Sequence, residues 1–374
     1  MISPKDFINY LGENGIDFFA GVPDSLLKNI CAYIADTQDE SHNIITANEG
    51  GAIGLAAGYH LATGRIGCVY MQNSGEGNII NPLASLTDKD VYGIPVLLII
   101  GWRGKPGVHD EPQHAKQGKV TLSLLETMGI SYAVLEKDGD WKAQVSKAVR
   151  HMAGTGEVYA LVIEKDTFEP YVLEGPRLDF DMSREEAIQM VAGSISDSDA
   201  IVSTTGMISR ELFEYRAARG EGHEKDFLTV GSMGHASQIA LGIALQKPGR
   251  RIWCFDGDGA LIMHMGSMAI IAEKAPKNYV HVVFNNGAHD SVGGQPTVGL
   301  DIDIPAIAMA VGYKQAFSVT TKTGLHEVLS EILKDSEGPV LLEIKVRKGN
   351  RKDLGRPTTT PTQNKEALMD YLKD

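Results

Sequence analysis

The sequence predicts an α/β protein with two doubly wound parallel sheets, one in each half of the chain. Short β-rich runs alternate with longer helical patterns, as expected for parallel strands connected by helices. A stretch without clear period, rich in proline and glycine, interrupts the alternation at residues 166–182. The alternation then starts again. We therefore expect domains at 1–168 and 183–374, joined by a linker at 169–182.

In the first half, Ser3 and Pro4 form an N-cap and first helical turn, which predicts a helix through Leu11. Further helical patterns lie at 50–63 and 140–152. Six strand-like runs separate the helical patterns of this half, at residues 17–20, 43–47, 67–72, 96–100, 132–135 and 159–163.

In the second half, a capping-box pattern from Ser183 to Glu186 predicts the first helix. One helical stretch is expected at 260–274, and the tail 349–365 is expected to be an irregular loop before a last short helix. Six strand-like runs follow the same alternation, at residues 200–204, 226–230, 251–255, 279–284, 314–319 and 339–346.

Composition excludes several classes of protein. A net charge of −13 over 374 residues argues against binding to nucleic acid or to an anionic membrane surface. The three cysteines have no CxxC spacing, so neither a disulfide framework nor a zinc site is indicated. The N-terminus lacks a signal-peptide pattern, and the apolar run ending at Ile100 is too short to span a bilayer. We expect a cytoplasmic protein.

The strongest functional pattern is a GDG sequence at 257–259, followed at the end of the next strand by Asn285 and Asn286. Small residues let the backbone approach a diphosphate, and Mg²⁺ prefers oxygen ligands beside phosphates. Asp258 and one of the two asparagines would meet at the sheet edge where ligands bind in open α/β folds. Each pattern alone is also common in tight turns, but their combination at this spacing indicates a diphosphate site with Mg²⁺.

This arrangement resembles the cofactor signature of thiamine-diphosphate enzymes. The resemblance implies a pyrimidine-type domain followed by a diphosphate-type domain, without the middle domain of the larger pyruvate and benzoylformate decarboxylases. It implies that Asp258, the side chain of Asn286 (with Asn285 as the alternative) and the Ala288 carbonyl ligate Mg²⁺. The implied cofactor contacts are Glu49, Thr205, Gly206, Gly231, Met233, Gly257, Asp258, Gly259, Ala260 and Asn286.

Within this set, the resemblance implies that Met233 lies beneath the cofactor and bends it. It also implies that the Gly231 carbonyl accepts a hydrogen bond from the cofactor's 4′-amino group. Taken alone, the segment around them reads as a glycine-rich turn with a core methionine.

Glu49 lies at a strand-to-helix turn before a helix of small apolar residues. An acid in a first helical turn is common, because it stabilises the helix dipole. The pattern from Asn48 to Tyr59, however, resembles the N-terminal domain of the same enzymes. It implies that Glu49 promotes the reactive tautomer of the aminopyrimidine. It also implies a homodimer or larger assembly, because such sites usually combine domains of different subunits.

Two first-half segments are expected to meet the substrate. Asp24 follows the first strand, where larger 2-oxo-acid decarboxylases carry an acid that handles protons, and Ser25 lies beside it. Asn73 and Ser74 follow another strand and resemble a loop that meets substrate or cofactor.

The loop at 101–114 is the most distinctive segment. Arg103 and Lys105 bring two cations to the end of a buried strand and suit an anionic group on a substrate, although a solvated loop is the alternative. His114 could relay protons near neutral pH, or form a structural hydrogen bond.

The loop at 101–114, with the segment 21–28 and the tail 351–357, resembles phosphonopyruvate decarboxylases most closely and sulfopyruvate decarboxylases next. It implies decarboxylation of 3-phosphonopyruvate to phosphonoacetaldehyde through a cofactor enamine, with Glu49, Asp24 and His114 as catalytic residues. The fused chain favours phosphonopyruvate, because sulfopyruvate decarboxylases often split the two domains.

Three alternatives remain. The first is decarboxylation of sulfopyruvate or another 2-oxo acid. The second is a non-catalytic cofactor-binding module, which would be expected to lack Glu49 or a metal ligand. The third, a nucleotide-binding oxidoreductase, is disfavoured because no G-x-G-x-x-G opens a helix with an acid about 20 residues further on.

Overall fold

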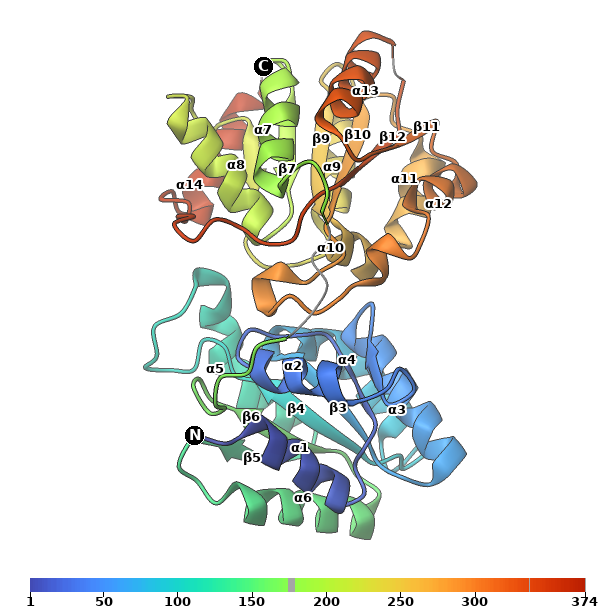
Figure 1. The fold of residues 1–374 in the computed structure, drawn as a ribbon, viewed down its shortest axis with the longest axis vertical. Coiled ribbons are helices and arrows are strands. Elements are labelled where there is room, and N and C mark those ends of the chain that lie inside the picture. Colours follow the sequence, from blue (N-terminus) through green and yellow to red (C-terminus); the bar gives the residue numbers. More distant parts are fainter. Residues whose placement is uncertain (174–178, 336, 374) are drawn as a thin grey trace. The chain divides into compact units, whose positions relative to one another are not determined.

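The computed structural model describes residues 1–173, 179–335 and 337–373. The chain divides into two compact units (Figure 1). Unit 1 comprises Met1–Gly175 with Val292–Gln295, and unit 2 comprises Pro176–Ser291 with Pro296–Asp374. Residues 174–178 of the predicted linker lie outside the described residues, so the linker boundaries stay a prediction.

Unit 1 is built on a six-stranded sheet in which every strand pairing is parallel, in the order β2-β1-β3-β4-β6-β5. Its strands are β1 (Phe19–Gly21), β2 (Asn43–Ile45), β3 (Gly67–Gln72), β4 (Val96–Gly101), β5 (Ser131–Leu135) and β6 (Tyr159–Ile163). Its helices are α1 (Pro4–Glu13), α2 (Lys28–Thr37), α3 (Glu49–Thr63), α4 (Glu76–Pro82), α5 (Pro112–Thr127) and α6 (Trp141–Thr155), with short turns η1 (Asn73–Gly75) and η2 (Leu83–Thr87).

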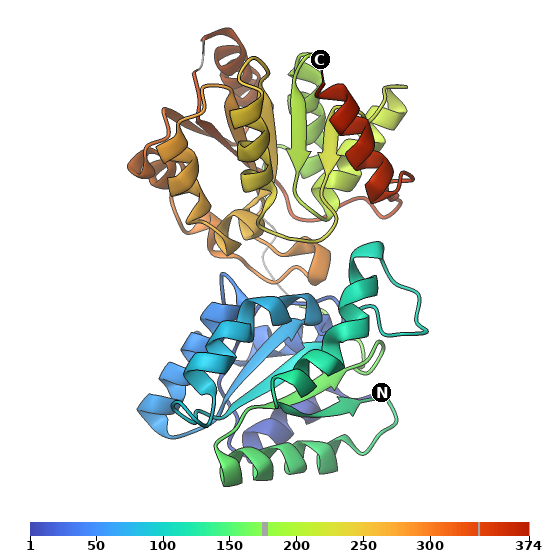
Figure 2. The same ribbon diagram turned by 180° about the vertical axis from the view of Figure 1, so that it is seen from behind.

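Helices cover both faces of this sheet (Figure 2). Helices α1, α2 and α6 pack on one face through a core cluster that includes Phe7, Ile30 and Met152. Helices α3, α4 and α5 pack on the other face, where Ile53 and Leu125 belong to a second cluster. The predicted doubly wound architecture of the first half is confirmed.

Unit 2 is also built on a six-stranded parallel sheet, in the order β11-β12-β10-β9-β7-β8. Its strands are β7 (Ala200–Ser203), β8 (Asp226–Leu228), β9 (Ile252–Gly257), β10 (Tyr279–Asn285), β11 (Gln315–Val319) and β12 (Val340–Lys345). Its helices are α7 (Arg184–Ser194), α8 (Met207–Ala218), α9 (Ala236–Gln246), α10 (Asp258–Met263), α11 (Ser267–Lys274), α12 (Ile304–Val311), α13 (Lys322–Asp335) and α14 (Pro361–Tyr371), with short turns η3 (Asp290–Val292) and η4 (Val298–Leu300).

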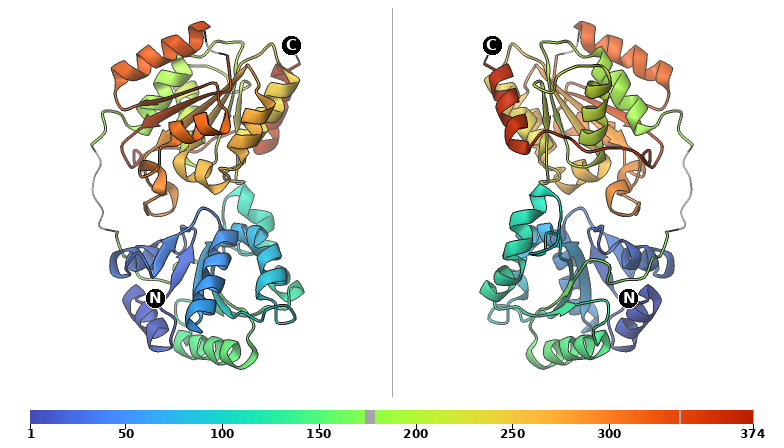
Figure 3. Two further views of the ribbon diagram at one scale, coloured as in Figure 1. Left: turned by 90° about the vertical axis from the view of Figure 1, so that its right-hand side faces the viewer. Right: turned by 90° about the vertical axis from the view of Figure 1, so that its left-hand side faces the viewer.

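The helices of unit 2 form two layers around its sheet (Figure 3). Helices α7, α8 and α13 pack on one face, where Ile188 and Leu329 belong to the core cluster. Helices α9, α11, α12 and α14 pack on the other face, around Ala240 and Ile271.

The two sheets share one topology. Numbered within its own unit, each sheet has the strand order 2-1-3-4-6-5. The winding direction therefore reverses between β1 and β3 in unit 1, and between β7 and β9 in unit 2. Ligands of open α/β sheets bind at the carboxyl ends of the strands beside such a reversal.

Local capping explains several helix boundaries. Ser3 caps α1 by accepting a hydrogen bond from the Asp6 amide, and the predicted capping box of α7 is formed by Ser183 and Glu186. The predicted helix 260–274 is wrong as one element, because α10 ends at Met263 and α11 begins only after Gly266, a poor helix former.

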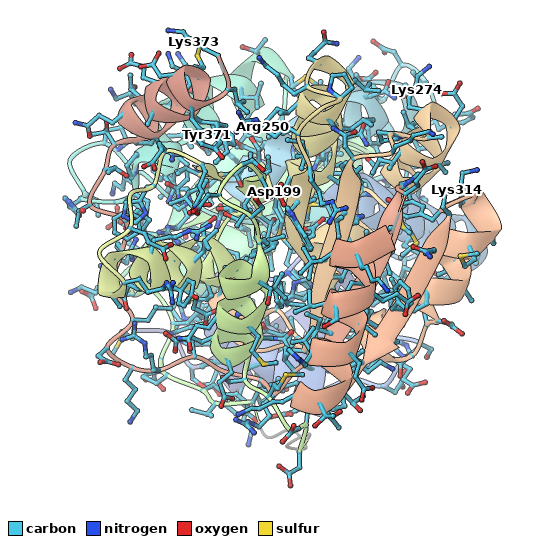
Figure 4. All side chains as sticks on the ribbon, turned by 90° about the horizontal axis from the view of Figure 1, so that it is seen from above. Asp199, Arg250, Lys274, Lys314, Tyr371 and Lys373 are labelled. Carbon is cyan, nitrogen blue, oxygen red and sulfur yellow. The ribbon has the colours of Figure 1, made fainter. Side chains whose placement is uncertain are left out.

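The tail 349–365 is also partly mispredicted. Helix α14 begins at Pro361, inside the expected loop, because Thr360 and Gln363 form a second capping box. The helix is held by an aromatic contact and a hydrogen bond: the Arg250 guanidinium lies 4.3 Å from the centre of the Tyr371 ring, and the Tyr371 hydroxyl donates to the Asp199 carbonyl at 2.8 Å (Figure 4). Among the described residues, none of the helices has the length and hydrophobicity needed to cross a bilayer.

Candidate active site

In unit 2, the predicted cofactor residues follow four strands that neighbour one another in the sheet. Thr205 and Gly206 follow β7, the segment 231–234 lies between β8 and α9, the GDG turn ends β9, and Asn286 follows β10. Because these strands are parallel, all four turns lie at one edge of the sheet.

The turns after β7 and β8 are joined by a hydrogen bond. The Gly231 amide donates to Oγ1 of Thr205 at 3.0 Å. Gly206 and Gly231 have φ values of +101° and +75°, a region that favours glycine, and Ser232 also has a positive φ of +49°. The turns after β7 and β8 therefore depend on glycine at Gly206 and Gly231.

The GDG turn packs against Met233 and His289. A Cβ on Gly259 would lie 3.0 Å from the His289 ring and 3.4 Å from Cε of Met233. Any larger residue would therefore require the His289 ring to shift. Burial lowers the pKa of His289 to about 4, so its imidazole is neutral at physiological pH.

Asp258 is a buried carboxylate surrounded by hydrogen-bond donors. The Thr297 hydroxyl donates to Oδ2, and the backbone amides of Asn286 and Gly259 also donate to the carboxylate. Burial nevertheless raises the pKa of Asp258 to about 6. Gly299 lies against it, since a Cβ there would be 2.8 Å from Oδ2 of Asp258.

The two asparagines have different partners. Asn285 donates to the Gly299 carbonyl at 2.6 Å and to Oε1 of Glu343 at 2.7 Å, so its amide links neighbouring segments of the core. Asn286 donates to Oδ2 of Asp290 at 2.6 Å, and its carbonyl oxygen accepts from the Ala288 amide at 3.0 Å.

These groups fit a hard cation. A desolvated carboxylate, a side-chain amide oxygen and a peptide carbonyl, here from Asp258, Asn286 and Ala288, are the oxygen ligands that Mg²⁺ prefers. The carboxylate also gains from a neighbouring positive charge, because burial has taken it out of water.

A separate group of polar side chains supports the GDG turn from within the core. Asp256 accepts a hydrogen bond from the Gly257 amide at 3.0 Å, and the His281 ring lies 3.4 Å from Asp256 and 3.2 Å from the Tyr313 hydroxyl. Cys254 lies beside them, and the possible ligand atoms of Cys254, Asp256 and His281 are within 4.8 Å of one another. Their hydrogen bonds give this group a structural role.

In unit 1, Glu49 is the first residue of α3 and is buried. Asn78 of α4 donates to Oε2 of Glu49 at 2.6 Å. The other carboxylate oxygen lies over Gly75, where a Cβ would be only 2.4 Å away. One oxygen is therefore held by an amide, and the other depends on a glycine for space.

Asp24 and Ser25 occupy the turn after β1. Asp24 is fully buried and accepts from Gln72 at 2.6 Å and from the Leu26 amide at 2.9 Å. Burial raises the pKa of Asp24, although these hydrogen bonds and Arg103 lower it. Ser25 accepts a hydrogen bond from Arg103 at 2.5 Å. The structure thus brings Asp24, Ser25 and Arg103 together.

Asp110 organises the loop at 101–114. Both its oxygens accept from Arg103, and it also accepts from the Gly104 and Glu111 amides at 2.8 Å and contacts Nδ1 of His114 at 2.9 Å. Burial opposes ionisation, but these donors together hold the pKa of Asp110 well below its usual range.

Lys105 and Asn73 also have partners within unit 1. Lys105 forms an ion pair with Glu164, so neither predicted cation is a solvated, unpaired charge. Asn73 is buried and donates to the Arg103 carbonyl at 2.8 Å while accepting from the Arg103 amide at 3.1 Å. It therefore clamps the loop. Ser74 is exposed and donates to Gln72 at 2.8 Å.

Several residues of these sites were not identified from the sequence. Glu76 is buried beside Gln117 and Thr121, and burial raises its pKa to about 8 against the hydrogen bonds from those two residues. Its Oε1 has no partner among the described residues. Asp110 lies within the predicted loop at 101–114 and Asp290 two residues beyond the predicted Ala288, and their carboxylates were the available signal. Thr297 and Asn78 lie in no sequence pattern that indicates a site, so their contacts with Asp258 and Glu49 became visible only in the structure.

Two family models match the chain. One, described as the N-terminal TPP binding domain of thiamine pyrophosphate enzymes, matches residues 4–125. The other, described as the C-terminal TPP binding domain of these enzymes, matches residues 204–344. The first match includes Glu49 and the loop at 101–114, and the second includes every predicted cofactor residue of unit 2.

The chain is similar to curated proteins over nearly its whole length. It is 34% identical to a phosphonopyruvate decarboxylase of Streptomyces viridochromogenes, covering 97% of this chain and 93% of that protein. It is also 34% identical to one of Streptomyces hygroscopicus, covering 100% and 95%. A sulfopyruvate decarboxylase of Methanosarcina acetivorans is 29% identical, covering 87% of each. A fused chain therefore does not by itself discriminate between the two substrates.

Glu76 makes a pH-dependent contribution to stability that can be measured. Its folded-state pKa of about 8 lies above the ordinary value of 4.5, so the folded state holds more protons between these values. This contribution is fully present below pH 4.5 and is lost as the pH rises through 8. Urea unfolding at pH 5.5, 7 and 8.5 should show that the free energy of unfolding falls as the pH rises, by roughly a few kcal/mol over this range.

The variant Glu76→Gln should remove most of this decline, because an amide does not ionise. The exposed-loop variant Glu40→Gln is the control and should keep the wild-type slope. An equal decline in Glu76→Gln and wild type would show that another group is responsible.

Proposed function

The chain belongs to the thiamine pyrophosphate enzymes, and on that premise we propose that it decarboxylates 3-phosphonopyruvate to phosphonoacetaldehyde and carbon dioxide. The observation that carries this proposal is the 34% identity to phosphonopyruvate decarboxylases over 97% and 100% of the chain. Sulfopyruvate is the second candidate substrate, because a sulfopyruvate decarboxylase matches 87% of the chain at 29% identity.

When bound, thiamine diphosphate supplies a nucleophilic carbon and an electron sink for the release of carbon dioxide. In this proposal, Thr205, Gly206 and the GDG turn hold the diphosphate, and Met233 supports the rings. Asp258, Asn286 and the Ala288 carbonyl hold Mg²⁺. Asn286 is preferred to Asn285 on the family resemblance alone, because each side-chain oxygen accepts one neighbouring backbone amide.

Glu49 holds the proton that activates the cofactor. Asn78 occupies Oε2, so proton transfer falls to Oε1, and Gly75 leaves that oxygen the space it needs.

Asp24 and His114 handle the later proton transfers. The raised pKa of Asp24 lets this carboxyl keep a proton closer to neutral pH. The contact of Nδ1 of His114 with Asp110 orients the ring and leaves Nε2 to exchange a proton.

Arg103 is the stronger of the two proposed anion contacts. Asp110 and Ser25 use three of its five N–H groups, which leaves two for a phosphonate. Lys105 is held by Glu164 and lies 5.5 Å from the centre of the Trp102 ring. Ser25 and Ser74 add hydroxyl groups near the strand ends, and Asn73 contributes by fixing the Arg103 backbone.

We further propose a homodimer or larger assembly in the cytoplasm. Helices α3 and α9 expose Leu55, Leu61 and Leu245, and such apolar side chains favour contact with another subunit. The three cysteines are free and buried, which suits a reducing compartment.

Substrate preference tests the proposed reaction. Purified protein with thiamine diphosphate and Mg²⁺ is given phosphonopyruvate, sulfopyruvate or pyruvate, and aldehyde formation is followed. We expect kcat/KM for phosphonopyruvate to exceed that for pyruvate by at least about tenfold, because pyruvate lacks the anionic group that Arg103 would contact. We expect it also to exceed that for sulfopyruvate, because a phosphonate carries more negative charge than a sulfonate. Preference for sulfopyruvate would replace the proposed substrate, and no turnover of any of the three would overturn the proposed activity.

Replacement of Glu49 tests the proton transfer. The variant Glu49→Gln should lower kcat by about 10²–10⁴-fold, because an amide cannot hold the proton, while the Kd for thiamine diphosphate changes little. Steady-state kinetics and fluorescence titration measure the two values. Glu40→Gln is the control. Near-normal turnover in Glu49→Gln would exclude the proposed role.

Mixed assemblies test whether sites are shared between subunits. Glu49→Gln and Asp258→Ala should each be inactive alone, but a hybrid dimer would contain one site with both residues intact. Co-expression with two affinity tags should therefore restore about a quarter of wild-type activity in the total pool, for random pairing around a twofold axis. Complete inactivity of isolated hybrids would place both residues of each site in one subunit.

A further inference from the structure

One oxygen of Asp290 collects donors from three separate segments of unit 2. Oδ2 accepts from the Asn286 side chain at 2.6 Å, from the Gly349 amide at 2.8 Å and from Nη1 of Arg184 at 3.1 Å. In the chain, Asn286 lies four residues before Asp290, Gly349 lies 59 residues after it, and Arg184 lies 106 residues before it. Asp290 is thus fixed independently of Asn286.

The contact with Asp290 decides which way the Asn286 amide faces. An ionised carboxylate can only accept hydrogen bonds, so the amide must turn its NH₂ group toward Asp290. Its carbonyl oxygen then faces away, and it accepts from the Ala288 amide at 3.0 Å. Without Asp290, only the bond from the Ala288 amide would hold this orientation.

The support behind Asp290 is charged and buried. Arg184 of α7 donates through Nε and Nη2 to Glu211 of α8 at 2.8 and 3.0 Å. The side chains of Arg184, Glu211 and Asp290 are 5%, 1% and 10% exposed. Arg184 therefore joins Asp290 to Glu211 of α8, and this buried network fixes the carboxylate that Asn286 contacts.

We propose that Asp290 is a positioning residue for the metal site, which holds the Asn286 oxygen ready for a divalent cation. This inference rests on the proposed Mg²⁺ site of the preceding subsection. A carboxylate that orients a ligand is a common way to raise metal affinity, and its loss typically weakens affinity 10–100-fold. The alternative role is structural, with Asp290 only tying the segment at Gly349 to unit 2.

Metal affinity, measured without substrate, tests the inference. Mn²⁺ serves as a paramagnetic probe and Mg²⁺ as its competitor, with wild type and variants saturated with thiamine diphosphate. We expect Asp290→Ala to raise the Kd for both ions about tenfold or more. Asp290→Glu keeps a negative charge beside Arg184 but moves the acceptor oxygen away from Asn286. It should therefore also raise the Kd, and it serves as the test variant if Asp290→Ala fails to fold.

Two comparisons separate positioning from structure. Glu185→Gln is the matched control, because Glu185 of α7 pairs with Arg351 at 2.9 Å, and its Kd should stay within about twofold of wild type. The double variant Asp290→Ala/Asn286→Ala should bind the ions no more weakly than Asn286→Ala, since Asp290 acts through Asn286. Additive losses, or an unchanged Kd in both Asp290 variants, would overturn the inference.

Asp258→Ala separates this inference from the proposed function. If Asp258→Ala weakens binding and the Asp290 variants do not, only the role of Asp290 fails. If Asp258→Ala also leaves the Kd unchanged, both the metal site and the inference fail. Substrate turnover enters neither measurement, so an error in the proposed substrate leaves the result intact.

Discussion

The parallel direction of every strand is the constraint on which both candidate sites depend. A parallel sheet places the carboxyl ends of all its strands at one edge, and in each unit the winding reverses between two central strands. Residues far apart in sequence therefore meet without any loop having to cross the sheet. In unit 2 this brings Thr205, Asp258 and Asn286 to one edge, and in unit 1 it does the same for Asp24 and Arg103.

The buried carboxylates differ in how their charge is compensated. Asp110 has a guanidinium and two backbone amides, and its pKa is held low. Asp258 has hydroxyl and amide donors but a pKa raised to about 6, which suits a residue that gains from a cation. Glu76 has only neutral partners, and burial raises its pKa further than that of Asp258, to about 8. The hydrogen-bond partners of each acid, more than the extent of its burial, therefore indicate its role.

The structure changes the interpretation of the basic loop. As a sequence pattern, Arg103 and Lys105 are two cations that suit an anion. In the fold, Asp110 and Glu164 neutralise much of their charge, and Arg103 is held rigidly by Ser25 and Asp110. A fixed guanidinium with two remaining N–H groups is better suited to a planar, directional contact than to general attraction.

For the part of the chain that the structure describes, the sequence by itself determined the fold class, all twelve strands and the turns that carry Glu49 and Asp258, because periodicity and turn chemistry are local properties. It missed the break between Met263 and Ser267, where Gly266 is a poor helix former, and it placed the start of α14 too late, where the capping box at Thr360 begins the helix. Only the tertiary structure decided the partners of these residues. Arg103 and Ser25 are 78 residues apart and Arg184 and Asp290 are 106, and a contact over that distance exists only once the chain has folded.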